Sequence, residues 1–337
     1  MGNSVTLPAT LDQTKTVARE RRAGILAVAA HLPEALITNA DLEAMVATSD
    51  TWIMERTGIR RRHRAGSGET SSTMGAIAAQ RALERWGGGE VDALVVTTVN
   101  PDTLFPSTAC LIQRRLGLGG IPAFDLNAAC SGFIYGLTVC EGLIRSGVGD
   151  HILLVAAEAM TPLVDFGDRS TCVLFGDGAG AAVVGAVSRG GIRARRLGAD
   201  GGLGHLIYYG PDGDDPASPD RIRMAGKGTF KMAVERFCEV TAQVCADAGW
   251  DPGEIDHFVP HQANLRIIEA SAKRLGLPME RVVLNVAETG NTSSASIPLA
   301  LAGADAEGRF RSGDRMVAAA FGAGVTWAAV AWEWGGA

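Results

Sequence analysis

The sequence has no apolar run long enough to cross a membrane and no excess of basic residues. Its longest uncharged stretch, residues 316–332, has 17 residues, whereas a membrane-spanning helix needs about 20. Lysine and arginine total 31 against 37 acidic residues, for a formal net charge of −6. We therefore expect no membrane span and no nucleic-acid partner. The Ala- and Gly-rich composition of residues 316–332 favours buried strands instead.

Cysteine is also scarce, and its six copies form no C-x-x-C pair and no regular spacing. This pattern excludes a disulfide framework and indicates a reducing compartment. The first residues contain no apolar segment of the kind that a secretory signal needs. We expect a cytoplasmic protein. Its 47% hydrophobic and 20% charged residues are typical of a globular chain with a sizeable core.

The chain contains an internal repeat with a shift of 164 residues. Residues 86–92 (WGGGEVD) align with residues 250–256 (WDPGEID), and the same shift relates Asn127 to Asn291. Several coincidences at one ungapped offset indicate a duplication.

The two halves are predicted to span residues 23–187 and 188–337 and to pack as one body. In each half, short apolar strand candidates such as residues 152–157 alternate with helical patterns such as residues 73–86. This alternation predicts a layered α/β architecture with largely buried sheets. The polar residues 210–219 are expected to form a surface loop.

Cys130 lies where a predicted strand gives way to a predicted helix. It follows apolar residues 123–126 and a turn of small residues, and it precedes an amphipathic pattern that begins near Gly132. A helix N-terminus favours the thiolate, and the turn is similar to a nucleophile elbow. The position predicts a nucleophile, with a small buried core residue as the alternative. The other five cysteines are assigned to the core.

Two of the six histidines, His257 and His261, stand four residues apart. Pro260 and its apolar neighbours predict a strand here, along which four residues span about 13 Å. That separation is too large for a shared metal ion, so we expect no metal site. His261 ends the strand and precedes a polar turn, and open α/β sheets build their active sites at strand ends.

Asn291 occupies in the second half the place that Asn127, three residues before Cys130, holds in the first. A near-twofold arrangement of the halves would bring both helix N-termini toward one central site. The alternative is that Asn291 only caps a helix.

Two glycine-rich stretches give different predictions. Residues 175–180 contain G-x-G-x-G but lead into a strand, so a dinucleotide-binding site is not expected. Residues 321–324 lie between apolar strands, where glycine permits close backbone approach and N–H groups could serve an oxyanion. The basic run at residues 60–64 (RRRHR) is interpreted as a solvated surface, with phosphate binding as the alternative.

Together these motifs resemble one family, the β-ketoacyl-acyl-carrier-protein synthases III of the thiolase fold. The most specific stretches are HQANLRII at residues 261–268 and GNTSSAS at residues 290–296. The resemblance covers about residues 24–332 and leaves residues 1–22 as an N-terminal extension. It implies an α/β fold in the form of a thiolase-like five-layered αβαβα sandwich made of two duplicated halves. Further matching stretches lie at residues 48–60, 105–110, 127–133 and 175–181.

The resemblance also implies roles for individual residues. Cys130 would accept the acyl group, with His261 and Asn291 completing the triad, and the N–H groups of Cys130 and Ala323 would form an oxyanion hole. The residues implied to bind coenzyme A are Trp52, Arg56, Arg169 and Asn264. The basic residues implied to receive an acyl carrier protein are Lys231, Arg266, Lys273 and Arg274.

The implied reaction is a ping-pong decarboxylative Claisen condensation of a short acyl-CoA primer, acetyl-CoA, with malonyl-acyl carrier protein, which initiates fatty acid synthesis. It implies no cofactor, because acyl-CoA and malonyl-carrier protein are both substrates. The resemblance further implies a homodimer, in which Phe105 of one subunit ends the acyl pocket of the other and favours short primers.

Two departures from the family pattern are Lys227, where Asn is common, and Ala323, where Gly is common. Two alternatives to the starter synthase remain open. One is a relative on the same scaffold that transfers acyl groups or condenses them in specialised metabolism. The other is a non-catalytic partner subunit, which the joint presence of Cys130, His261 and Asn291 disfavours.

Overall fold

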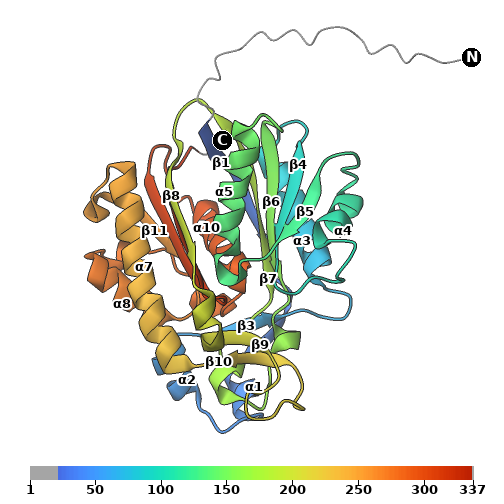
Figure 1. Cartoon of the computed structure of the whole chain (residues 1–337), viewed down its shortest axis with the longest axis vertical. Coiled ribbons are helices and arrows are strands. Elements are labelled where there is room, and N and C mark those ends of the chain that lie inside the picture. Colours follow the sequence, from blue (N-terminus) through green and yellow to red (C-terminus); the bar gives the residue numbers. More distant parts are fainter. Residues whose placement is uncertain (1–21, 336–337) are drawn as a thin grey trace, which may run out of the picture.

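The structure is a computed structural model that describes residues 22–335 (Figure 1). Its first sheet has five strands in the order β1-β7-β6-β4-β5. β4 runs parallel to β5 and β6, whereas β7 runs antiparallel to β6 and β1, so β5 forms one edge. The strands are β1 (Arg22–His31), β4 (Ala93–Thr97), β5 (Ala123–Leu126), β6 (His151–Glu158) and β7 (Gly178–Val187).

The second sheet has four strands in the order β11-β12-β13-β8. It repeats the order β4-β6-β7-β1 of the first sheet and has no counterpart of β5 among the described residues. The apolar residues 316–332 form most of the β12–β13 antiparallel pair, as predicted, with Met316 and Trp332 paired and buried. The strands are β8 (Gly191–Ala199), β11 (His257–Pro260), β12 (Arg315–Gly322) and β13 (Thr326–Glu333).

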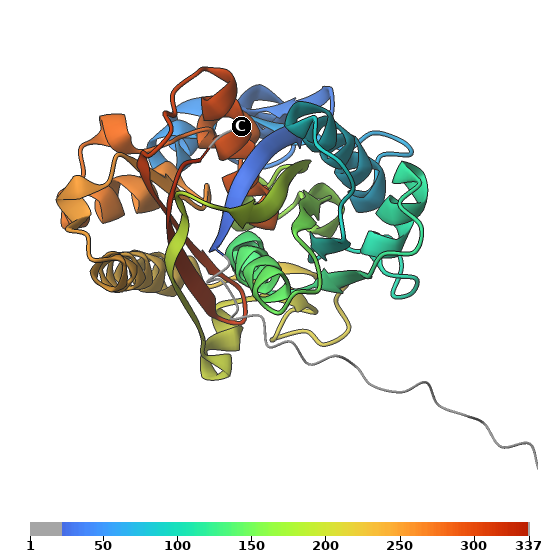
Figure 2. The same ribbon diagram turned by 90° about the horizontal axis from the view of Figure 1, so that it is seen from above.

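Helices complete a five-layered αβαβα sandwich (Figures 1 and 2). The central layer is made of α5 (Gly132–Arg145) and α10 (Ser296–Ala306), which pack between the two sheets. α3 (Ser71–Trp86) and α4 (Thr108–Leu116) cover the outer face of the first sheet. α7 (Gly226–Ala248) covers the outer face of the second, and α8 (Leu265–Leu275) packs beside α7. The duplicated thiolase-like sandwich expected from the sequence is confirmed.

The 164-residue shift holds at the level of single residues in the central layer. β6 begins at His151 and β12 begins at Arg315, and α5 and α10 begin 164 residues apart. Ala129 and Ser293, which the shift relates, are the two described non-glycine residues with positive φ, 48° and 49°. In each turn, the N–H of this residue donates to the Asn side chain two residues earlier. The sequence repeat therefore records two equivalent strand-to-helix elbows.

Smaller elements gather at the end of the sandwich where these elbows lie (Figure 1). Residues 211–220 connect β9 to β10 and are mostly exposed, as expected of a surface loop. The short strands and helices are β2 (Ala35–Thr38), α1 (Asn39–Glu43), α2 (Asp50–Thr57), β3 (Arg61–Arg64), α6 (Arg169–Cys172), β9 (Ile207–Gly210), β10 (Arg221–Met224) and α9 (Val286–Thr289). The 3-10 turns are η1 (Ala129–Ser131), η2 (Thr161–Leu163), η3 (Gly201–Leu206), η4 (Pro252–Glu254), η5 (Met279–Arg281) and η6 (Ser293–Ala295).

The surface interpretation of residues 60–64 is wrong for Arg62. This side chain is 0% exposed, its Nη1 donates to Asn39 Oδ1 at 2.6 Å and its Nε donates to the Val173 carbonyl at 3.1 Å. Strand alternation along β3 turns Arg62 inward while its neighbours stay at the surface. Arg62 is therefore a structural cation under the active-site turns.

The other predictions about chain organisation have separate outcomes. Cys140, Cys172, Cys238 and Cys245 are buried as assigned, whereas Cys110 is only partly buried. The boundary between residues 187 and 188 stays a prediction, and the extension at residues 1–22 lies outside the described residues except for its last position. Among residues 22–335, no helix combines the length and the apolar character needed to cross a bilayer.

Candidate active site

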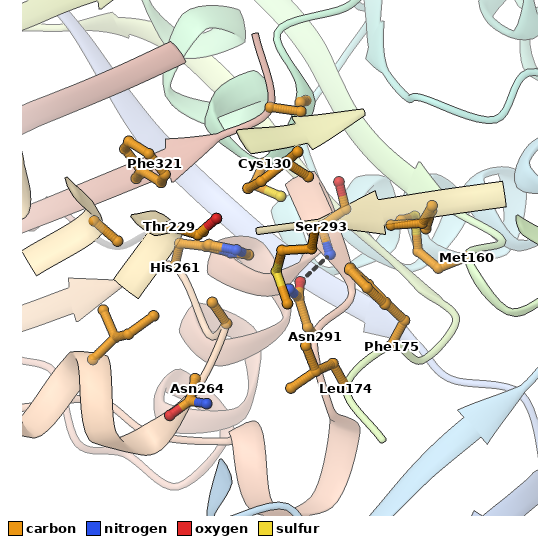
Figure 3. A pocket seen from close by; sticks show the side chains of 18 of the residues that line it. Cys130, Met160, Leu174, Phe175, Thr229, His261, Asn264, Asn291, Ser293 and Phe321 are labelled. Carbon is orange, nitrogen blue, oxygen red and sulfur yellow. Dashed lines mark hydrogen bonds between the residues drawn. The ribbon is translucent and has the colours of Figure 1, made fainter. Parts of the chain in front are cut away.

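A narrow cavity of about 180 Å³ opens at the end of the sandwich where the two elbows meet. Most of its lining is apolar and comes from the β9–β10 hairpin, α7 and the segment between β6 and β7. Cys130, His261 and Asn291 all line it, and Figure 3 shows their side chains converging on one space. Residues predicted from three distant segments are thus brought together.

Cys130 lies in η1, immediately before α5, on the elbow that Ala129 forms with its positive φ. Burial raises the pKa of its thiol to about 12, and the hydroxyl of Ser293 acts in the opposite direction. The sequence predicts a thiolate favoured by the helix N-terminus, and desolvation acts against that effect here.

His261 follows β11 directly and is 1% exposed. Its Nδ1 lies 2.7 Å from Ser296 Oγ, and the Gln262 N–H donates to the same oxygen at 3.2 Å. Burial lowers the pKa of the imidazole to about 3, so the ring is neutral at physiological pH. Because the Gln262 N–H occupies one lone pair of Ser296 Oγ, the hydroxyl proton of Ser296 is available to Nδ1 of His261. In the tautomer in which Nδ1 accepts this proton, Nε2 carries the ring hydrogen and is a hydrogen-bond donor.

Asn291 is held by hydrogen bonds to its backbone and to its side chain. The backbone N–H donates to the Leu174 carbonyl at 2.8 Å, and the backbone carbonyl accepts from the Gly176 N–H at 3.1 Å. Its Oδ1 accepts from the Ser293 N–H at 2.9 Å (dashed in Figure 3). Asn291 does not cap a helix, because the N-cap positions of η6 and α10 are Thr292 and Ala295. The Ser293 contact orients the amide, whose NH₂ group remains for the cavity.

The end of β12 approaches the Cys130 backbone closely. A Cβ on Gly322 would lie 2.7 Å from the Cys130 nitrogen, nearer than real Cβ atoms come. The adjacent Ala323 lines the cavity, and its carbonyl accepts from the Thr326 hydroxyl at 3.2 Å. The glycine at position 322 thus permits the approach that the sequence predicts for residues 321–324.

The four residues expected to bind coenzyme A form one cluster. The Arg169 guanidinium stacks over the Trp52 ring at 4.6 Å, and Asn264 Nδ2 donates to the Arg56 carbonyl at 3.0 Å. Trp52 and Arg56 share α2, and Asn264 lines the cavity. Asn264 also caps α8 through its Oδ1. Its side chain therefore joins the cluster to the start of that helix.

The four residues expected to receive a carrier protein lie on neighbouring helices. Lys231 belongs to α7, and the other three belong to α8. Arg266 stacks over Phe230 of α7 at 5.6 Å, and all four side chains are exposed. Lys273 and Arg274 lie in the last turn of α8. The structure thus turns a set that is scattered in sequence into one basic surface.

Phe105 does not line the cavity of its own chain. It lies in the segment between β4 and α4 and is 85% exposed, and its neighbour Leu104 is 91% exposed. Two large apolar side chains are thus exposed next to each other in the segment that leads into α4.

Sequence reasoning missed two polar residues behind the cavity wall, Ser296 and Glu158. Ser296 contacts His261, and Glu158 is a fully buried carboxyl at the end of β6. The sequence did contain a signal for the position of Ser296. The 164-residue shift aligns it with Gly132, so it was expected at the start of the helix that is equivalent to the one after Cys130. Glu158 carried no signal, since an acidic residue that ends an apolar strand usually faces solvent.

The chain is similar to known proteins over most of its length. Models of the 3-oxoacyl-[acyl-carrier-protein] synthase III family match residues 124–201, and models of its C-terminal part match residues 245–334. The β-ketoacyl-[acyl-carrier-protein] synthase III of Coxiella burnetii is 46% identical over 311 residues, which cover 91% of this chain and 98% of that protein.

Solved structures agree with this similarity. The β-ketoacyl-[acyl-carrier-protein] synthase III of Thermus thermophilus is 47% identical, with a TM-score of 0.89 over 93% of this chain and 100% of that one. A priming β-ketosynthase of the R1128 polyketide pathway is 36% identical, with a TM-score of 0.90 over 96% and 99%. The chain therefore belongs to the β-ketoacyl-[acyl-carrier-protein] synthase III family of acyltransferases, condensing enzymes of the thiolase fold.

Proposed function

We propose that this chain condenses a short acyl-CoA primer, acetyl-CoA, with malonyl-acyl carrier protein and so initiates fatty acid synthesis. The observation that carries the proposal is the convergence of Cys130, His261 and Asn291, supplied by both halves, on one narrow apolar cavity. Such a cavity suits a thioester arm with a small acyl group, and the three side chains suit a ping-pong reaction.

In the first half-reaction, Cys130 Sγ bonds to the thioester carbonyl carbon and the bond to the coenzyme A sulfur breaks. The proton of the Cys130 thiol passes to the departing sulfur, so no proton is lost and no strong base is needed. The N–H groups of Cys130 and Ala323 stabilise the oxyanion of the tetrahedral intermediate. Removing one such donor typically slows a reaction about 10²–10³-fold.

In the second half-reaction, malonyl-carrier protein loses CO₂ and leaves an enolate. The Nε2–H of His261 and the amide of Asn291 donate to the enolate oxygen, and a neutral imidazole suits this role. The enolate carbon then attacks the Cys130 thioester. A carbon–carbon bond forms, the carbon–sulfur bond breaks, and the Cys130 thiolate takes up a proton from solvent.

Two surfaces would bind the substrates. Trp52 and Arg56 would hold the adenine of coenzyme A, and Arg169, which stacks on Trp52, offers a cation for its phosphates. Asn264 lies between this cluster and the cavity, on the path of the pantetheine arm. The basic surface of Lys231, Arg266, Lys273 and Arg274 would attract an acidic carrier protein.

A homodimer would complete the acyl pocket. The edge strand β5 pairs with β4 on one side only among the described residues, and an unpaired edge is a template for a second copy. Phe105 and Leu104 are exposed in the segment that leads into α4, a helix that contacts β5, and Phe105 of one subunit would end the pocket of the other. Phe105→Thr should then extend the range of accepted primers. Unchanged chain-length preference in a dimeric variant would place the limit elsewhere.

The proposed reaction needs no cofactor and no metal, since both thioesters are substrates. A cytoplasmic location accords with free cysteines and with a supply of coenzyme A thioesters. The alternative is a related enzyme of specialised metabolism, which the similarity to a polyketide priming ketosynthase favours. That alternative keeps Cys130 and changes the primer or the acceptor.

The proposal is tested by mixing the protein with malonyl-acyl carrier protein and each member of an acyl-CoA panel. We expect a β-ketoacyl-carrier product and one CO₂ per turnover, with acetyl-CoA the best primer. Product formation only with longer or branched primers would favour specialised metabolism. Absence of any β-ketoacyl product in the presence of an acylated Cys130 would reject condensation.

A further inference from the structure

Glu158 is a buried carboxyl for which the proposed reaction has no use. It is the last residue of β6, is 0% exposed and forms no ion pair with any cation in residues 22–335. A buried carboxylate without a cation is costly unless hydrogen bonds satisfy its oxygens. A buried carboxylate beside the active site lowers the stability of the fold, and this cost indicates that Glu158 has a role in the site.

Its two oxygens hold two different parts of the chain. Oε2 accepts from the Val99 N–H at 2.9 Å and from the Thr98 hydroxyl at 3.2 Å, at the end of β4. Oε1 accepts from the Ser294 hydroxyl at 2.6 Å and from the Ser294 N–H at 3.3 Å, in η6. Ser294 Oγ also lies 3.2 Å from Thr97 Oγ1. Glu158 thus ties the second half of the chain to the first.

The segment tied down carries Asn291. Ser294 comes directly after Ser293, whose positive φ shapes the turn, and Ser293 donates its N–H to Asn291 Oδ1. The packing behind this turn is tight, because a Cβ on Gly132 would lie 3.1 Å from the Cβ of Ser294. A shift of Ser294 would therefore be transmitted to the Asn291 amide.

Glu158 also acts on Cys130 through space. Burial raises the pKa of Glu158 to about 7, and its negative charge adds to the raised pKa of the Cys130 thiol. The groups facing it from β4 and η6 are hydroxyls and N–H groups. Asp177, which precedes the neighbouring β7, turns its carboxylate toward Thr161 and Ala65 instead.

We propose that Glu158 is a positioning residue for condensation: it fixes the Asn291–Ser294 turn against the end of β4, so that the Asn291 amide faces the acyl group on Cys130. This proposal rests on the proposed function and adds to it a residue that touches no substrate. Asn291 acts in the second half-reaction, so this half-reaction is the step that should depend on Glu158.

The test variant is Glu158→Gln, which keeps the shape and removes the charge. The Gln oxygen can accept from the Val99 N–H, and its NH₂ can donate to a reoriented Ser294 hydroxyl, so the main loss is the bond from the Ser294 N–H. We expect kcat for condensation to fall about tenfold, with the KM for acyl-CoA and the rate of acyl loading within about twofold of wild type. Ser294→Ala removes the hydroxyl that donates to Glu158 Oε1, so this variant should also slow condensation.

A second readout needs no substrate. The rate of alkylation of Cys130 by iodoacetamide, followed by peptide mass because Cys110 is partly exposed, is measured against pH. We expect the profile of Glu158→Gln to move to lower pH, because a charge that opposes the thiolate is gone. Reactivity should therefore rise while acyl loading stays unchanged and condensation falls. A general loss of structure would also expose the thiol and raise alkylation, but it would lower acyl loading and condensation together.

Glu141→Gln is the matched control. Glu141 is also a buried carboxyl, but it lies in the part of α5 that is far from Cys130. There it pairs with Arg145 of the same helix and with Arg195 of β8. This variant should lose stability without changing the ratio of condensation to acyl loading. The proposal is overturned if Glu158→Gln condenses at the wild-type rate, or if acyl loading falls as much as condensation does. A wild-type protein that loads Cys130 but never condenses would reject the proposed function, while the alkylation profile would still decide whether Glu158 faces Cys130.

Discussion

His261 Nδ1 and Ser296 Oγ lie 2.7 Å apart, and this contact joins the end of β11 to the first residue of the central helix α10. Both side chains are buried, so the bond is not shared with bulk water. The contact holds the ring, and in the tautomer in which Ser296 donates to Nδ1 it leaves Nε2 as the donor toward the cavity. Ser296 is therefore a positioning residue for His261.

Ser296→Ala should slow condensation about tenfold, as expected for one lost hydrogen bond in a dry site. Acyl loading of Cys130 should change little, because His261 acts on the enolate. The two rates are measured separately by single-turnover loading and by product formation. Ser271→Ala is the control, since Ser271 is another buried helical serine, whose hydroxyl donates to the Ile267 carbonyl in its own helix. Equal effects of the two substitutions would argue against a role for Ser296.

Gly322→Ala should reduce acyl loading about 10²-fold, because the new Cβ displaces the Cys130 N–H from the oxyanion. The added methyl would lie 2.7 Å from the Cys130 nitrogen. Gly303→Ala is a matched control, because an added Cβ there meets nothing within 4 Å on α10. Loading rates of the two variants are compared at equal folded fraction. Normal loading by Gly322→Ala would show that the Cys130 N–H is not used.

Lys273→Glu should raise the KM for malonyl-carrier protein about tenfold at low salt and leave acyl-CoA loading unchanged. The reason is charge repulsion at the basic surface, which salt screens. Arg311→Glu makes the same change of charge in the segment between α10 and β12, at the opposite end of the sandwich. The KM is measured at several salt concentrations. An equal rise of the KM in both variants would locate the carrier protein elsewhere.

The neutral state of His261 should make the protein sensitive to acid. Its folded-state pKa is about 3, below the ordinary value of 6.5, so between these values the unfolded chain binds a proton that the folded chain does not. This contribution to stability is fully present above pH 6.5 and is lost as the pH falls toward 3. The free energy of unfolding of His261→Asn should therefore fall less than that of wild type between pH 7 and pH 4.5. Urea denaturation measures it, with the exposed His205→Asn as control. Parallel losses in all three proteins would contradict the burial argument.

Local sequence signals predicted much of this structure because the relevant information is local or periodic. The 164-residue shift identified both elbows, since Asn127 and Asn291 each accept a hydrogen bond within a turn built from their own neighbours. The buried hairpin at residues 316–332 followed from its composition alone.

The features that the sequence signals missed or misjudged depend on contacts between distant segments. Arg62 is buried because it meets Val173, 111 residues away. Glu158 is satisfied by Ser294, 136 residues away. The pKa of Cys130 was predicted from the helix N-terminus, but the surrounding apolar wall, which comes from both halves, decides its direction.

The central claim is that Cys130 carries the acyl group. The most direct measurement is the intact mass of the protein after mixing with acetyl-CoA, with peptide mapping of the adduct and Cys130→Ala as control. We predict a single acetyl adduct on Cys130, absent in the variant and discharged when malonyl-acyl carrier protein is added. An adduct that persists in Cys130→Ala, or no adduct with any acyl-CoA, would contradict this account.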